Sequence, residues 1–380
     1  MTSTVFQAFR LLFGLILAGF ILYFLLSYSG AYGAGEESRI KNDIIKNFIT
    51  AANDVHQTGV PVSFTQFGES DLDFDLRLDA TFTPPTHYPG LESTEITKTL
   101  LIPILLLPGD DVYLYRESAN IGWWIFYFTE ALSDVSFIFV QLDSSTGATD
   151  VIASIVDALP QSNYKPEINF GFCDGNDLYY YDLCDGQRCT RNDFDNLVGG
   201  YQASSKCTAE LPLNHRLITV SSACSASDYD EGVCITPSDS NGIGEAFIKG
   251  SAETYFYKNR FGLYKLDLLA LVIGGDESNI FGITGENYYQ YINNMFSEHI
   301  KTASDTMIAR SNIMADSLIM SQDCIQQHSS FALILGSIYT LLSNNPQYYN
   351  DYSDTNEFLS LLAEADNAYD LLDNYGCGVE

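Results

Sequence analysis

One strongly apolar run without a charge, Leu11–Tyr28, restricts what the chain can be more than any other feature. Its 18 residues would span about 27 Å as a helix, close to the roughly 30 Å of a bilayer's hydrocarbon core. Twelve of them are Leu, Ile or Phe, which together favour membrane insertion by about 4 to 7 kcal/mol. The sequence therefore predicts one transmembrane helix, through which the chain contacts the lipid bilayer.

A cleavable signal peptide is the alternative, because small residues between Ser29 and Gly35 follow the stretch. A signal-peptide core normally spans about 7–15 residues, so the length favours a retained anchor. Basic residues favour a cytoplasmic C-terminal domain, since Arg39, Lys41 and Lys46 follow the helix and Arg10 precedes it. Long domains can cross membranes regardless of such charges, however. The cysteines described next favour a domain outside the cytoplasm.

Eight cysteines are present, and six of them lie in a Gly-, Asp- and Ser-rich stretch. The even count and the clustering predict disulfide bonds formed in an oxidising compartment. No Cys-x-x-Cys pair occurs and the histidines lie far apart, which disfavours structural zinc. The pairing cannot be read from the sequence, although Cys324 with Cys377 suggests one bridge. The disulfide candidates are Cys173, Cys184, Cys189, Cys207, Cys224, Cys234, Cys324 and Cys377.

The chain carries 49 acidic and 18 basic residues, which gives a formal net charge of −31. Such a field repels phosphate backbones, so nucleic acid is excluded as a partner. The hydrophobic content of 46% is enough for a sizeable core and excludes a disordered acidic tail.

Hydrophobic periodicity predicts an α+β fold in which a mixed β-sheet has flanking helices, a disulfide-rich insertion and a helical C-terminal section. Glu36–Gly59 has the stripe of an amphipathic helix, and Phe331–Leu342 is too short for a span and is expected in the core. A strand, a helix and a strand in Val135–Phe172 indicate a crossover unit, and a hairpin is expected in Glu245–Lys258. The expected segments are an anchor and Gly/Ser hinge (1–35), a helix and mixed-sheet core (36–172), a cysteine-rich insertion (173–240), return strands (241–284) and a helical section (285–380).

Two acidic segments are candidate calcium sites. Asp71, Asp73 and Asp75 resemble the start of an EF-hand loop, but Leu76 and Phe82 replace its Gly and Glu, so a solvated strand face is expected. The segment that contains Asp174, Asp177, Asp182 and Asp185 has the composition of ordinary turns and could also hold Ca²⁺. We therefore expect no cofactor, with Ca²⁺ as the open alternative.

No catalytic or nucleotide-binding motif is complete, so no catalytic residue is predicted. Aromatic residues make up 13% of the chain and form adjacent groups, which suit either a core or an exposed binding surface. The groups are Trp123–Trp124, Tyr179–Tyr181, Tyr255–Tyr257 and Tyr288–Tyr289.

The N-terminal segment Phe6–Phe20 resembles the hydrophobic N-terminal helix of archaeal pilin-like proteins. The layout as a whole, including Gly244–Gly250 and Thr254–Tyr257, resembles uncharacterised single-pass surface proteins of small-celled archaea. The resemblance implies no activity and no site residues. It agrees with an expected function as a non-enzymatic, membrane-anchored envelope protein for adhesion, cell contact or a pilin-like assembly. A secreted or anchored hydrolase and a solute-sensing ectodomain remain the alternatives.

Overall fold

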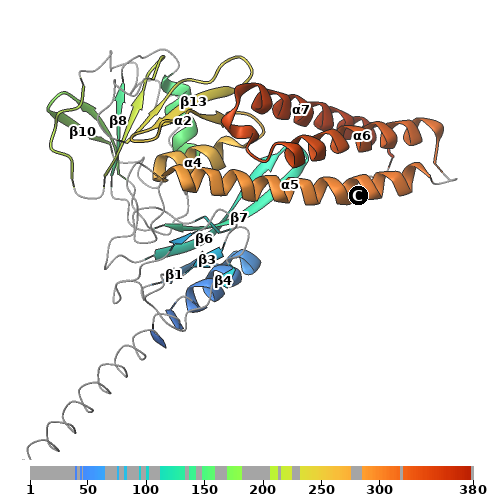
Figure 1. Ribbon diagram of the computed structural model, residues 1–380, viewed down its shortest axis with the longest axis horizontal. Coiled ribbons are helices and arrows are strands. Elements are labelled where there is room, and N and C mark those ends of the chain that lie inside the picture. The colour runs from blue at the N-terminus through green and yellow to red at the C-terminus, as the bar shows by residue number, and fades with distance from the viewer. Residues whose placement is uncertain are drawn as a thin grey trace, which may run out of the picture.

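The computed structural model in Figure 1 describes most of the chain beyond the first 38 residues. The described residues are 39–40, 43–44, 46–64, 75–76, 81–83, 94–95, 100–101, 112–132, 137–142, 148–158, 169–181, 206–212, 215–224, 232–274, 285–316 and 320–377. Within them no helix is both long and apolar enough to cross a membrane, and the expected span Leu11–Tyr28 lies outside them.

A seven-stranded mixed sheet forms the centre of the fold, in the order β10-β9-β8-β11-β12-β13-β14. The four inner strands β9, β8, β11 and β12 are parallel, and the outer strands pair antiparallel. The strands are β8 (Phe137–Leu142), β9 (Asn169–Asp174), β10 (Asp177–Tyr181), β11 (His215–Val220), β12 (Val233–Ile235), β13 (Ile243–Ile248) and β14 (Tyr255–Lys258).

The expected crossover unit is confirmed, because α2 (Ala148–Ala158) connects the parallel neighbours β8 and β9. Alternate residues of β8 enter two different clusters: Ile138 and Val140 pack in the main core, whereas Phe139 packs with Cys173 and Leu217 on the other face. Both faces of the inner strands are therefore buried, which explains their nearly continuous apolar sequences. The hairpin β13–β14 is also confirmed.

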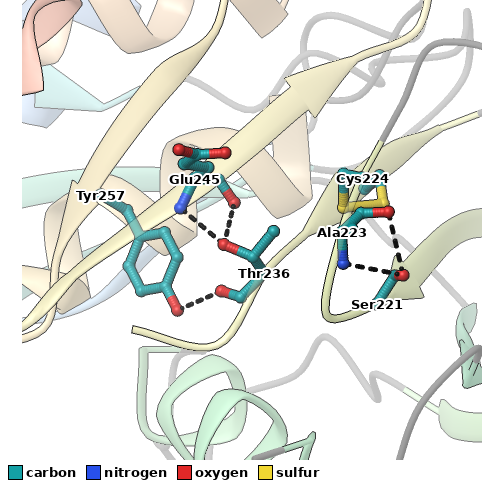
Figure 2. The surroundings of a disulfide bond; sticks show 7 residues. Ser221, Ala223, Cys224, Thr236, Glu245 and Tyr257 are labelled. Carbon is teal, nitrogen blue, oxygen red and sulfur yellow. Dashed lines mark hydrogen bonds between the residues drawn. A yellow bond between two sulfur atoms is a disulfide. The ribbon is translucent and has the colours of Figure 1, made fainter. Parts of the chain in front are cut away.

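The segment expected as a cysteine-rich insertion contributes strands to this sheet. Its strands β11 and β12 lie between β8 and β13, so residues 215–220 and 233–235 belong to the core. At their ends, Thr236 extends the ladder to β13, since its hydroxyl accepts from Glu245 N at 2.8 Å. Tyr257 donates to Thr236 O at 2.7 Å, as Figure 2 shows.

A second sheet, in the order β1-β6-β7-β5, contains the long hairpin of β6 (Val112–Ile121) and β7 (Trp124–Leu132). β1 (Val62–Phe64) and β5 (Leu100–Leu101) flank this hairpin. The helical residues 46–58 pack on this sheet: Phe48 contacts Phe64 of β1 edge to face, and Arg116 of β6 donates to His56 O at 3.1 Å. Gly59 ends this helix at φ 71, as expected. A small third sheet contains β2 (Asp75–Leu76), β3 (Thr81–Thr83) and β4 (Thr94–Glu95).

Long helices form the C-terminal section and extend to one side of the large sheet (Figure 1). The helical pattern is interrupted after Asn344, where the short helix η3 (Tyr348–Asn350) turns the chain back. The helices are α5 (Gly285–Ala315), α6 (Gln322–Asn344) and α7 (Tyr352–Asn374), and α6 packs between the other two. A further helix that the sequence patterns did not predict, α4 (Tyr264–Gly274), joins the sheet to this section.

The tip of the β6–β7 hairpin connects the second sheet to the long helices. Trp123 stacks on Tyr369 of α7, with ring centroids 5.7 Å apart, and contacts Phe331 of α6 edge to face. The indole nitrogen of Trp124 lies 3.1 Å from the sulfur of Met307 on α5. The hairpin therefore contacts all three helices through one aromatic tip.

Replacing Trp123 with alanine should reduce the free energy of unfolding by about 2–4 kcal/mol, because the ring contacts to two helices are lost. Ile125, exposed at 58% on the same hairpin, gives the control, and Ile125→Ala should cost less than about 1 kcal/mol. Urea unfolding of both variants measures the difference. Equal losses would show that the tryptophan contacts do not hold the hairpin in place.

Candidate functional site

Six of the eight candidate cysteines lie in the described residues, and all six form disulfide bonds. The pairs are Cys173–Cys207, Cys224–Cys234 and Cys324–Cys377, and the last is the pair that the sequence suggested. Cys184 and Cys189 lie outside the described residues.

The two bridges in the large sheet attach loops to its inner strands. Cys173–Cys207 holds residues 206–212 against one face, where Thr208 N donates to Gly175 O at 2.7 Å. Cys224–Cys234, drawn in Figure 2, joins the chain beyond β11 to β12. One bridge thus attaches a loop to β9, and the other ties the chain that follows β11 to the short strand β12.

The acidic segments contain no evident cation site in the part of the chain that can be described. Asp174 and Asp177 are paired opposite each other across the β9–β10 turn, where Gly175 has φ 58, which supports the turn interpretation. Among the described residues, no group of three or more His, Cys, Asp or Glu side chains could hold a metal ion. Asp71, Asp73, Asp182 and Asp185 lie outside these residues.

Most described aromatic side chains from the predicted groups contribute to the core. Tyr255, Tyr257 and Tyr289 are fully buried, and the two tryptophans are partly buried against the helices. Of the two alternatives that the sequence left open for these aromatic groups, these side chains therefore belong to the core and do not form an exposed binding surface.

The outward face of α6 is the candidate functional surface. Phe331 points toward the hairpin tip and is buried, whereas Leu333 is exposed at 74%. Two residues advance an α-helix by about 200°, so Leu333 lies on the side away from the hairpin. Part of the segment expected in the core thus faces outward. This face consists of Gln326, Ser329, Ser330, Leu333, Ser337 and Thr340, which are all exposed.

These six residues lie within an arc of about 100° and extend about 21 Å along the helix, and none of them is charged. The only acidic residue of α6 is Asp323, in its first turn. By contrast, α7 has the same length of 23 residues and carries Asp354, Glu357, Glu364, Asp366, Asp370 and Asp373. The outward face of α6 therefore differs from α7 in carrying no carboxylate.

Hydroxyl groups on the outward face already have hydrogen-bond partners within the helix. Ser329 donates to Ile325 O at 2.8 Å, and Thr340 donates to Gly336 O at 2.7 Å. Covering these two hydroxyl groups would therefore leave neither donor unsatisfied. A Cβ placed on Gly336, at the edge of the face, meets no atom within 4 Å, so the helix backbone can be approached closely there.

The Cys324–Cys377 bridge and a buried histidine fix the rotation of α6. Cys324 lies in the first turn of the helix, and Ser321 caps this turn by accepting from Cys324 N at 3.3 Å. One turn later, His328 Nε2 lies 3.1 Å from Cys377 O. Because a carbonyl oxygen only accepts, His328 carries a proton on Nε2. These contacts orient the outward face relative to α7.

A second cluster, fully buried, lies where the large sheet meets the helices. Lys258 ends β14, Asp267 lies on α4 and Asn293 lies on α5, and each is 1% exposed. Lys258 Nζ is 2.9 Å from Asp267 Oδ2 and donates to Asn293 Oδ1 at 2.8 Å. Burial lowers the pKa of Lys258 and raises the pKa of Asp267, because desolvation outweighs the attraction between them. The sequence did not indicate this cluster.

No protein-family model matches the chain, and neither a curated protein nor a solved structure is detectably similar to it. Its function is therefore inferred from its own residues.

Removing the bridge that orients α6, in the double variant Cys324→Ser with Cys377→Ser, should destabilise the domain by about 4 kcal/mol, because the bridge closes a loop of 53 residues. The matched variant Cys224→Ser with Cys234→Ser opens a loop of 10 residues and should cost about 3 kcal/mol. Urea unfolding under oxidising conditions compares the two. A smaller loss for the C-terminal bridge would contradict its role in holding α6.

Proposed function

We propose that the chain is a non-enzymatic envelope protein, anchored through Leu11–Tyr28 with its folded domain outside the cytoplasm. Three disulfide bonds support this location, because such bonds persist in oxidising compartments and are rare in the cytosol. Among adhesion, cell contact and surface assembly, we favour assembly of identical copies through the outward face of α6, in the manner of a pilin-like protein.

The observation that carries this proposal is the uncharged outward face in a strongly acidic chain. Two copies with a formal charge of −31 each repel one another wherever their carboxylates meet. The face around Leu333 carries no carboxylate of its own, so a contact made there adds less repulsion than a contact between acidic faces. A second copy is therefore the occupant that the charge distribution favours.

The side chains of this face also suit close packing of two helices. Ser329, Ser337 and Thr340 are small and hydrogen bonded within the helix, so a second α6 helix can cover these three hydroxyl groups without breaking their hydrogen bonds. Leu333 supplies the exposed apolar area at the centre. A symmetric pair would place the same face on both copies, as in most homodimers.

The variant Leu333→Glu should prevent self-association, because it puts a charge at the centre of the face on both copies. Sedimentation velocity of the native-length protein in detergent, over a range of concentrations, measures the association constant. We expect at least a tenfold weakening, which corresponds to about 1.4 kcal/mol.

Ile125→Glu is the matched control, since Ile125 is comparably exposed but lies on the hairpin, away from this face. It should associate like the unmodified protein. Assembly through α6 would be contradicted if the unmodified protein stayed monomeric at all concentrations. It would also be contradicted if the two variants weakened association equally.

A further inference from the structure

We propose that Lys258 and Asn293 form a covalent isopeptide bond in the folded protein, with Asp267 as the group that transfers the proton and with release of ammonia. This inference concerns the buried cluster and does not depend on the assembly of copies. The bond would join the last strand of the large sheet directly to α5.

The reacting groups already lie together. Lys258 Nζ is 2.8 Å from Asn293 Oδ1, and a C=O bond is about 1.2 Å long, so the amide carbon Cγ lies within about 4 Å of the amine. Groups held in this way react as if at very high concentration, with effective molarities of about 10⁵–10⁸ M in well-oriented cases. Proximity therefore favours the attack of the amine on the amide.

Asp267 contacts both nitrogen atoms of the exchange. Its Oδ1 lies 3.2 Å from Lys258 Nζ and accepts from Asn293 Nδ2 at 3.3 Å. The backbone N–H of Lys258 donates to Asp267 Oδ2 at 2.8 Å, which fixes the carboxyl group. One carboxyl group can thus take a proton from the amine and deliver it to the departing nitrogen.

The reaction balances without any further reactant. A proton first passes from the Lys258 ammonium to the Asp267 carboxylate, which gives a neutral amine and a carboxylic acid. The lone pair of Nζ then forms a bond to Cγ of Asn293. As the Cγ–Nδ2 bond breaks, Asp267 passes its proton to Nδ2 and accepts another from Nζ, and ammonia leaves. No atom is oxidised or reduced.

The surroundings favour the neutral forms that this chemistry requires. Desolvation lowers the pKa of Lys258 and raises the pKa of Asp267, so the proton moves toward the carboxylate more readily than it would in water. Tyr289 and Tyr348 are fully buried beside the cluster, and Lys258 Nζ lies 5.4 Å from the centre of the Tyr348 ring. Such burial also disfavours hydrolysis of the amide by water.

Peptide mapping of the unmodified protein tests this proposal directly. After reduction, alkylation and trypsin digestion, we expect residues 250–260 joined to residues 266–301, with a mass below their sum by one ammonia molecule. Trypsin should not cleave after Lys258. Free peptides cleaved after Lys258 with Asn293 intact, or with Asn293 converted to aspartate, would overturn the proposal.

Variants test the role of each group. Asp267→Asn keeps the size of the side chain and should leave the two peptides separate. Asn294→Ala is the matched control, because Asn294 neighbours Asn293 on α5 but instead accepts from Tyr349 OH at 3.0 Å, and it should retain the joined peptides. A joined pair in Asp267→Asn would overturn the assignment of the proton transfer. If this variant does not fold, the map of the unmodified protein still decides whether the bond exists.

Discussion

The contact between Lys258 and Asp267 joins the large sheet to the helices that lead away from it. Removing two charges from water costs several kcal/mol per ion, so such a pair persists only where its geometry and its further hydrogen bonds are good. Here Asn293 and the backbone of Lys258 complete the hydrogen bonds, and three different elements meet. This junction fixes α5 to the large sheet, and α6 packs on α5 beside it.

The regular parts of this architecture could be predicted from local patterns. The β8–α2–β9 crossover and the helical C-terminal section were predicted because apolar periodicity and turn residues mark them in the sequence. The helix α4 was not predicted, since its residues Leu266–Val272 are almost entirely apolar and buried around the helix, which removes the helical stripe. Strands β11 and β12 were hidden for another reason, because the cysteines and turns around them indicated an insertion.

The candidate sites were less accessible to sequence reasoning. Asp267 is one of 49 acidic residues, and only its burial and its proximity to Lys258 and Asn293 distinguish it. The outward face of α6 was concealed inside an apolar stretch, where Leu333 could be recognised as exposed only once the hairpin was seen to pack on the opposite side. The Cys173–Cys207 pairing likewise depends on how distant strands and loops meet in space.

The three disulfide bonds support the proposed location of the folded domain outside the cytoplasm. Alkylation of the protein in denaturant without a reducing agent, followed by peptide mass analysis, tests this central claim most directly. The account predicts that Cys173, Cys207, Cys224, Cys234, Cys324 and Cys377 all remain unlabelled. Labelled cysteines at these positions in protein taken directly from its cells would show a reducing environment, and would contradict both the disulfide framework and the extracytoplasmic location.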